Sequence, residues 1–263
     1  MSGGAVRIGR SLLALLLLPV VLLAFWWVLS ADSTSFYMPP LRTVFETFPD
    51  TWSTDGLTEH VVPSVQRLAA GYLLALVLGV SLGVAIGSAR RLRAFLEPVL
   101  EFLRAIPPTV LVPLFMLFAG LGDTMKVLVI VSGAVWPILL NTIEGVRAVD
   151  GTLRETCRCY GIGGTARLRH LVIRSASPQI VTGMRQGLSI AIILMVISEL
   201  FAADNGIGYV LVQSQRGFAI AEMWTAIIVL GLLGIALAML LRLFEWRTLR
   251  WYRGLREAQR GRS

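Results

Sequence analysis

The feature that most constrains this chain is a series of long, uncharged apolar runs. A helix needs about 20 apolar residues to cross a bilayer, and the runs of near this length are Ser11–Ala31, Leu68–Ala89, Ala105–Gly122, Val127–Ile143 and Met223–Leu241. A shorter run, Gln186–Ser198, is bounded by Arg185 and Glu199. Because the runs are continuous and do not alternate with polar residues, they favour helices over a transmembrane barrel. The sequence therefore predicts an all-α membrane protein with about six transmembrane helices.

Charge is distributed unevenly between these runs. The chain is 56% hydrophobic with a net charge of +8, and its basic residues gather near both termini and in the segments 90–93 and 147–174. By contrast, the segments 31–63 and 203–222 hold one arginine each. The positive-inside rule places the basic segments and both termini in the cytoplasm, which agrees with six spans. We therefore attribute the charge to membrane topology and expect no nucleic-acid partner.

The first apolar run has two interpretations, a retained anchor helix and a cleavable signal peptide. Basic residues precede it, and small residues lie near a potential cleavage point at Val28–Ala31. However, the run is longer than a cleavable core of about 7–15 residues. We expect an anchor and outer segment at 1–63, a transmembrane domain at 64–244 and a basic cytoplasmic tail at 245–263.

Motifs for catalysis and metal binding are missing from the sequence. There is no G-x-x-x-x-G-K-S/T phosphate-binding loop, so we expect no ATP hydrolysis by that route. Cys157 and Cys159 lie in a loop assigned to the reducing cytoplasm and lack the partners of a zinc site. The GLGD at Gly120–Asp123 lacks the second aspartate that an aspartyl protease requires. The sequence predicts neither an enzyme nor a cofactor.

A few ionisable residues lie within or beside the predicted spans, where charge is costly and is usually paired or functional. Arg67 opens the second span, and Glu101 and Arg104 lie three residues apart at the expected start of the third, where they can pair. Snorkelling toward water explains both arginines equally well. Glu199 is too short to snorkel, so it is a candidate either for the translocation path or for a structural bond near an outer gate.

The third run contains two adjacent prolines, Pro107 and Pro108. Each removes a backbone donor and clashes with the preceding turn, and in lipid the freed carbonyls need protein or water partners. We interpret this break, together with Arg104, as part of a translocation path. The alternative is a kink that serves only packing.

An outer segment follows the fifth predicted span and contains Asn205, Gly206 and Gly208. Its glycines permit a tight turn. We expect this segment to contact an extracytoplasmic partner or to form an outer gate.

The loop at 147–178 is polar but patterned. Thr152 and Glu155 have the spacing of a capping box, and Gly161 can end the helix that they begin. A second helical stretch, Thr165–Ser175, follows, and we expect Pro178 to end it before the fifth span. Two short helices exposed to the cytoplasm suit contact with a soluble partner, the alternative being a solvated connection.

The same loop resembles the cytoplasmic motif of ABC importer permeases, which reads E-A-A, three residues, G, nine residues, I, one residue, L-P. Glu155 and Gly161 match in type and spacing, whereas Thr156 and Cys157 replace the alanines and Arg174 replaces the proline. Further segments are similar to the nitrate, sulfonate and taurine branch of these permeases: Met38–Phe45, Glu101–Ile130, Trp136–Asp150 and Ser198–Gln215.

The resemblance implies a type I ABC importer permease fold in the bacterial cytoplasmic (inner) membrane. It also implies that Glu155, Thr156, Cys157 and Gly161 form a coupling helix that binds a separate ATP-binding subunit. The two lost alanines change the face that would fit this subunit, so a specialised ATP-binding partner stays open. A solute-binding protein or lipoprotein would deliver the substrate to a path between two copies of the permease, a homodimer. The implied substrate is a small anion of the alkanesulfonate, taurine or nitrate type. A vitamin precursor, or an autonomous carrier, stays open as an alternative.

Overall fold

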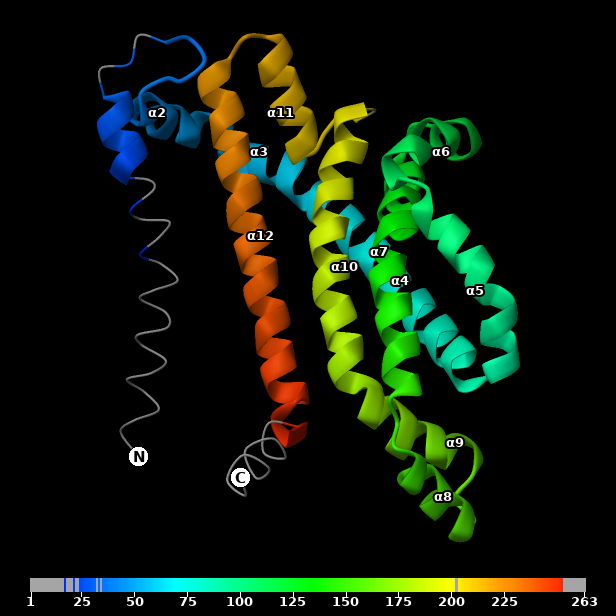
Figure 1. Cartoon of the computed structure of the whole chain (residues 1–263). Coiled ribbons are helices and arrows are strands. Elements are labelled where there is room, and N and C mark those ends of the chain that lie inside the picture. The colour runs from blue at the N-terminus through cyan, green and yellow to red at the C-terminus, as the bar shows by residue number, and fades with distance from the viewer. Residues whose placement is uncertain are drawn as a thin grey trace, which may run out of the picture.

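The computed structural model describes residues 24–31, 33, 35–201 and 203–252, together with Leu17 and Val21. Within these residues the regular secondary structure is helical, without strands. Most of the first predicted span, Ser11–Ala31, and the tail beyond residue 252 lie outside the described residues. The helices run roughly side by side, with α8 and α9 at one end of the molecule and α2 and α11 at the other (Figure 1). We refer to these ends as the α8 end and the α11 end.

The core consists of three long helices, α4 (Val62–Ser88), α7 (Asp123–Arg147) and α10 (Ile173–Phe201). Helix α7 packs along both α4 and α10. Glycines allow this close approach, since a Cβ at Gly79 of α4 would lie 2.7 Å from Ile138 of α7. Gly183 of α10 is equally restricted, because its Cβ would lie 2.7 Å from the carbonyl oxygen of Pro137. Small residues at helix crossings are typical of membrane proteins, where packing holds helices together.

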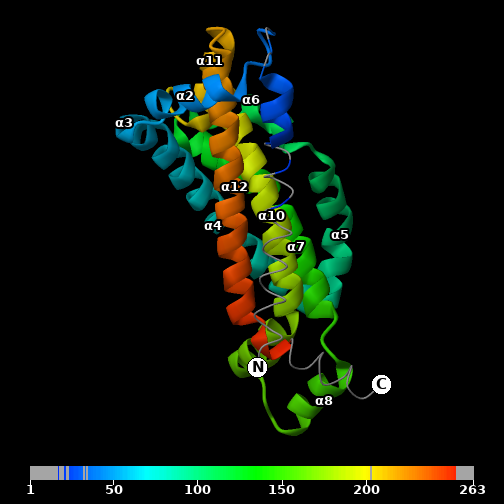
Figure 2. The same ribbon diagram turned by 90° about the vertical axis from the view of Figure 1, so that its left-hand side faces the viewer.

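Helix α12 (Ile220–Thr248) lies at the edge of the bundle beside α10 (Figures 1 and 2). In its most apolar window only 6% of residues are buried, compared with 50% for the helix that contains α10. Most of the α12 surface is thus not covered by the other described helices.

The part of the chain that the structure describes has four helices long and apolar enough to cross a membrane: Thr54–Ser88, Asp123–Arg147, Gly164–Phe201 and Ile220–Thr248. The number rises to five if one bent pair is counted as a single span. These correspond to five of the six predicted runs, and the sixth is the N-terminal run.

The bent pair is the third predicted span. Helix α5 (Arg90–Ala105) is followed by a 78° bend, a 3₁₀ turn (η2, Pro108–Leu111) and α6 (Val112–Ala119). Ile106 and Pro107, which each precede a proline, have extended backbones, as steric clash with the proline ring requires. The predicted break at Pro107–Pro108 is confirmed.

One expectation about this span is wrong. Glu101 and Arg104 lie near the C-terminal end of α5, next to the bend, and not at the start of the span. Helix α5 does not stand out as an uncharged run because one of its faces is charged, at Arg93, Glu97, Glu101 and Arg104. These positions recur at intervals of three or four residues, so they share one side of a helix.

The α11 end is built from short elements: α2 (Leu41–Thr51), α3 (Thr54–Gly56), a π-helical turn (η1, Leu57–Val61) and α11 (Ile207–Arg216). Helix α11 packs against α12. The indole nitrogen of Trp52 donates a buried hydrogen bond of 2.9 Å to the Thr225 hydroxyl of α12.

At the opposite end, α8 (Gly151–Cys159) and α9 (Gly164–Arg167) form the connection between α7 and α10. A π-helical turn (η3, Leu168–Val172) joins α9 to α10 without interruption. The expectation that Pro178 ends this helix is wrong, because Pro178 lies inside α10. Its ring removes the hydrogen bond to the carbonyl of Arg174, and the hydroxyl of Ser177 donates to that carbonyl instead, at 2.8 Å.

Candidate functional site

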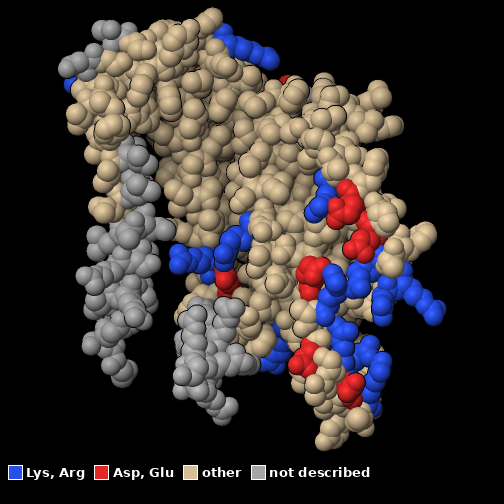
Figure 3. All heavy atoms as spheres, viewed as in Figure 1, with Lys and Arg blue, Asp and Glu red and all other residues tan. Residues whose placement is uncertain are grey.

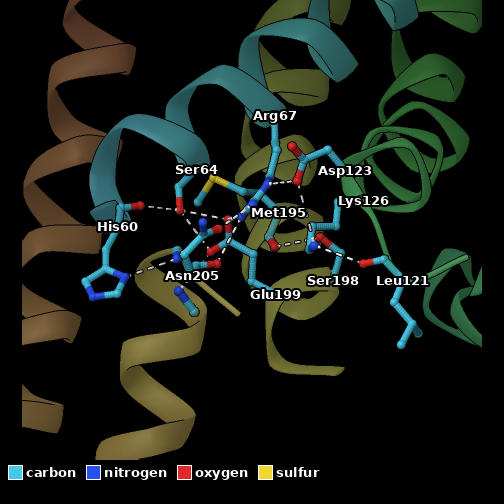
Figure 4. Close-up of polar contacts among 12 residues, drawn as sticks. His60, Ser64, Arg67, Leu121, Asp123, Lys126, Met195, Ser198, Glu199 and Asn205 are labelled. Atoms are coloured by element: carbon cyan, nitrogen blue, oxygen red, sulfur yellow. Dashed lines mark hydrogen bonds and ion pairs between the residues drawn. The ribbon is translucent and has the colours of Figure 1, made fainter. Parts of the chain in front are cut away.

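A cluster of charged and polar side chains is buried near the α11 end, and we call it the Arg67–Glu199 cluster (Figure 4). Its guanidinium donor, Arg67 of α4, is only 6% exposed, and the carboxylate of Glu199 on α10 is fully buried. Nη1 of Arg67 donates to Oε1 of Glu199 at 3.0 Å. Arg67 therefore does not snorkel toward water; it is held inside the protein by an opposite charge.

Arg67 has further acceptors on two other segments. Its Nη1 and Nη2 bond the backbone and side-chain oxygens of Asn205 at 3.0 and 2.5 Å, and its Nε donates to Asp123 of α7 at 2.7 Å. One guanidinium thus joins α4, α7, α10 and the segment before α11. A planar group with five donors is suited to several acceptors at once.

Glu199 is satisfied by donors as well as by Arg67. The Ser64 hydroxyl lies 2.7 Å from Oε1, and the backbone N–H of Gly208 donates to Oε2 at 2.9 Å. Ser64 in turn accepts the backbone N–H of Ile207 at 2.9 Å. Of the two roles left open by the sequence, these contacts support the structural bond for Glu199.

The outer glycines have a second purpose besides the predicted turn. Gly206 has a φ of +121°, which favours glycine, and a Cβ there would lie 2.5 Å from the carboxyl carbon of Glu199. At Gly208 a Cβ would lie 2.7 Å from the Cβ of Glu199. The structure thus brings together four predicted residues, Glu199, Asn205, Gly206 and Gly208, that the sequence treated as two separate features.

Other members of the cluster were not found from the sequence. In the sequence Asp123 stands out only as the end of the GLGD pattern, and Ser64 gives no signal. Lys126 of α7 is 4% exposed; its amine donates to the carbonyl of Leu121 at 3.2 Å and lies 3.8 Å from Asp123. The one signal in the sequence is that Lys126 lies next to an apolar run. A lysine buried there needs acceptors nearby.

The predicted coupling segment forms a helix, but its cap differs from the prediction. The carboxylate of Asp150 accepts the backbone N–H groups of Thr152 and Leu153 at 2.6 and 3.3 Å, so Asp150 is the N-cap of α8. These backbone bonds, that of Leu153 foremost, lower the pKa of Asp150. The capping box of Thr152 and Glu155 is therefore wrong. The helix begins earlier, where an aspartate can satisfy two free N–H groups.

The residues proposed for coupling lie on an exposed surface. Glu155 and Thr156 are exposed, and Cys157 is half-buried with a free thiol. Gly161 has a φ of +66°, as predicted for the residue that ends this helix. Figure 1 shows α8 projecting beyond the ends of α7 and α10. A bond of 2.7 Å from Arg154 to the carbonyl of Val146 connects α8 to α7.

The break in the third span carries its own exposed charges. Arg104 and Glu101 form the predicted pair at 2.7 Å, with about half of each side chain exposed. Pro107 is exposed, whereas Pro108 packs near Gly133 of α7. Figure 3 shows charged side chains gathered over the α5 and α8 side, while the α11 end has few. Arg104 and Pro107 are exposed, and neither has a hydrogen bond or ion pair to Glu199 among the described residues.

No group of three or more potential metal ligands occurs among the residues that the structure describes. The polar contacts of the Arg67–Glu199 cluster hold several helices together, and α8 presents an exposed surface at the opposite end.

Comparison with known proteins agrees with the resemblance found in the sequence. The family model described as "binding-protein-dependent transport system inner membrane component" matches residues 75–249. The aliphatic sulfonates permease SsuC of Bacillus subtilis, itself described as putative, is 31% identical over 90% of this chain and 86% of its own length. The taurine permease TauC of Escherichia coli is 28% identical over 88% of this chain and 87% of its own. The nitrate import permease NrtB of a Synechocystis strain is 29% identical over 82% of each chain.

A solved structure of the MetNI methionine ABC transporter, described as inward facing, is similar with a TM-score of 0.61. It covers 73% of this chain and 93% of its own at 18% identity, a level at which the likeness concerns the fold. The chain belongs to the family of binding-protein-dependent transport system inner-membrane components, the permeases of ABC importers, and within it to the nitrate, sulfonate and taurine branch.

Proposed function

We propose that this chain is the membrane subunit of an ATP-driven importer for a small anion of the alkanesulfonate, taurine or nitrate type. The named relatives support this substrate class. The observation that carries the proposal is α8, a capped helix that projects from the bundle with Glu155 and Thr156 exposed. In the proposed complex the α8 end faces the cytoplasm and binds a separate ATP-binding subunit.

The proposed coupling runs through two helices that meet at α8. Helix α7 leads into it, and the unbroken helix Gly164–Phe201 leads away from it. Helix α10 alone has 29 residues, a length of about 43 Å at 1.5 Å per residue. Glu199 lies near its far end, so a displacement at α8 reaches the Arg67–Glu199 cluster along one rigid element. We propose that this connection shifts the population between inward-open and outward-open states.

The proposed path for the solute lies between two copies of the chain and passes the charged face of α5. Charges on a span are costly in lipid, so they face water or protein. The exposed pair of Glu101 and Arg104 and the exposed Pro107 meet this condition on the described surface. A solute-binding protein at the α11 end would supply the solute.

The first test is uptake of labelled taurine, an alkanesulfonate and nitrate by cells that express the chain with its genomic ATP-binding and binding-protein partners. Glu155→Arg reverses a charge on the exposed face of α8, so we expect ATP-dependent uptake to be lost while membrane insertion is unchanged. Glu155→Asp keeps the negative charge at the same position and is the matched control, expected to transport normally. Normal uptake by Glu155→Arg would contradict the coupling role of α8.

The energy source is tested in the same cells. We expect replacement of the phosphate-loop lysine in the ATP-binding subunit to abolish uptake. Uptake that persists without that lysine would instead identify an autonomous carrier. If none of the three anions is transported but a vitamin precursor is, the substrate class is wrong and the ATP-driven mechanism stands.

The path is tested by Pro107→Ala combined with Pro108→Ala. Restoring two backbone donors straightens the bend between α5 and α6, so we expect the transport rate to fall. An unchanged rate would show that the break serves only packing. Pro178→Ala is the control, because Pro178 lies within a helix that continues through it.

A further inference from the structure

A cavity of about 840 Å³ opens between α10 and α12 in the half of the molecule nearer α8. Its walls come from residues 178–192 of α10 and from residues 234–252, which include the second half of α12 and the residues just after it. This volume is within the range of about 300–1,000 Å³ that is usual for small-molecule sites. The cavity lies outside the Arg67–Glu199 cluster and the coupling segment, and neither of those uses it.

The lining of the cavity changes character along its length. Helix α10 runs away from α8, and α12 runs back toward it. Later residues of α10 therefore lie beside earlier residues of α12. The end farther from α8 is mostly apolar and is lined by Leu188, Ser189, Ile192, Gly234, Ala238 and Leu241. The end nearer α8 is polar and aromatic and includes Thr182, Arg185, Arg242, Glu245, Trp246 and Tyr252. An amphiphilic molecule, with an apolar tail and a polar head, would match this arrangement.

The apolar end has open space. A Cβ at Gly234 would meet no atom of this chain within 4 Å, so no other helix of this chain approaches closely there. The surrounding α12 surface is the least buried of the long helices. In a bilayer this space is accessible to an acyl chain from the side.

The polar end carries an excess of positive charge. Arg185 and Glu245 form an ion pair across the cavity, from α10 to α12. Arg242 also lines the cavity, and within residues 35–201 and 203–252 it has no ion pair or side-chain hydrogen bond. One acid therefore faces two arginines, which leaves a cation for an anionic group.

Aromatic residues place this polar end at a membrane surface. Trp246 and Tyr252 line the cavity, and the guanidinium of Arg174 lies 5.5 Å from the ring centre of Trp251. Tryptophan, tyrosine and arginine at the end of a span are typical of the layer of lipid headgroups. Basic pockets between transmembrane helices at this depth bind anionic lipid headgroups.

We propose that this cavity binds an anionic phospholipid from the leaflet on the α8 side. Its acyl chain lies against the apolar end beside Gly234, and its phosphate accepts hydrogen bonds from Arg242. Nitrate and taurine have no acyl chain for the apolar end, a short alkanesulfonate would fill little of it, and an apolar helix from another chain would have no anion for Arg242. The proposal depends on the membrane location of the family and not on the solute or the energy source, so it stands or fails separately from the proposed function.

The test uses the full-length chain in lipid nanodiscs with photoactivatable phosphatidylglycerol or phosphatidylcholine, each with the reactive group in its acyl chain. Mass spectrometry then locates the labelled peptides. We expect phosphatidylglycerol to label the peptides around residues 188–192 and 234–241 several-fold more strongly than phosphatidylcholine. Arg242→Gln should reduce this to the level of phosphatidylcholine. Arg247→Gln removes a charge from the same helix outside the cavity and should leave the labelling unchanged.

A second pair of variants tests the apolar end. Gly234→Phe fills the cavity without a backbone clash and should reduce labelling by both lipids several-fold. Gly231→Phe, one turn away on α12, also points into open space but does not line the cavity, and it should label as the unchanged chain does. Three results would overturn the proposal: equal labelling by the two lipids, labelling insensitive to Arg242→Gln and Gly234→Phe, or crosslinks in native membranes showing that a protein helix fills the cavity.

Discussion

At the α11 end, Arg67 and Glu199 are buried against each other, whereas at the α8 end Glu155 and its neighbours on α8 are exposed. The buried pair has every partner it needs within this chain, from α4, α7, α10 and the segment before α11. The exposed helix is connected to the rest of the chain by few contacts, among them the bond from Arg154 to Val146. At the α11 end, the buried charged groups are satisfied by hydrogen bonds and ion pairs within this chain. At the α8 end, the polar surface is left for water or another molecule.

The largest effect should follow from breaking the buried pair. Glu199→Ala leaves Arg67 buried without its fully buried counterion, and breaking such a pair typically costs about 3–5 kcal/mol. The free energy of unfolding, measured in detergent with a denaturant, should fall by about this much. Glu101→Ala removes an acid from an exposed pair and should cost less than about 1 kcal/mol. Similar losses for the two variants would show that burial does not make the Arg67–Glu199 pair more important for stability than the exposed pair.

A smaller loss should follow from filling the space beside Glu199. In Gly208→Ala the new Cβ would lie 2.7 Å from the Cβ of Glu199 and 2.9 Å from the carbonyl oxygen of Val196. Overpacking of this kind typically costs about 1–3 kcal/mol. Gly231→Ala adds the same methyl group where no atom lies within 4 Å. The thermal midpoint should fall for Gly208→Ala and should not fall for Gly231→Ala; equal midpoints would contradict the restricted space at Gly208.

The smallest effect should be local to α8. Asp150→Ala removes the acceptor for the backbone N–H groups of Thr152 and Leu153. Hydrogen exchange at these two amides should become faster, while exchange in α7 and α10 stays unchanged. Slower exchange in Asp150→Asn than in Asp150→Ala would be the expected rescue, because asparagine also caps helices. If exchange spreads into α10, then α8 is more firmly attached to the bundle than its exposed surface indicates.

The same cap gives a dependence on pH with a definite sign. The backbone bonds lower the pKa of Asp150 in the folded chain, so the charged form is the one that the fold stabilises. The stabilisation is complete above the unfolded pKa of about 3.9 and is lost as the pH falls through the lower folded value. Exchange protection of α8, corrected for intrinsic rates, should therefore be level from neutral pH to about pH 5. A loss between pH 7 and 6 would implicate another group.

Much of the fold could be predicted because it depends on neighbouring residues. Long apolar runs predict membrane helices since lipid offers no partners to the backbone. The break at Pro107–Pro108 was predictable because proline acts on its own turn. Gly161 was predictable because a glycine after a helix readily adopts a positive φ. The local failures were the start of α8, where Asp150 competes with Thr152 as a cap, and Pro178, whose missing bond Ser177 compensates.

The pairing of Arg67 with Glu199 was decided only by the tertiary structure. The two residues are 132 positions apart, and each looks alone like an isolated charge in an apolar span. Their contact depends on how α4 and α10 are placed around α7, and on the turn at Gly206 that brings Asn205 and Gly208 to the same point. The sequence by itself determines local structure, which depends on a residue and its few neighbours along the chain. Which buried charges meet is determined by helix packing, because a buried charge is stable only where the folded chain supplies its partner.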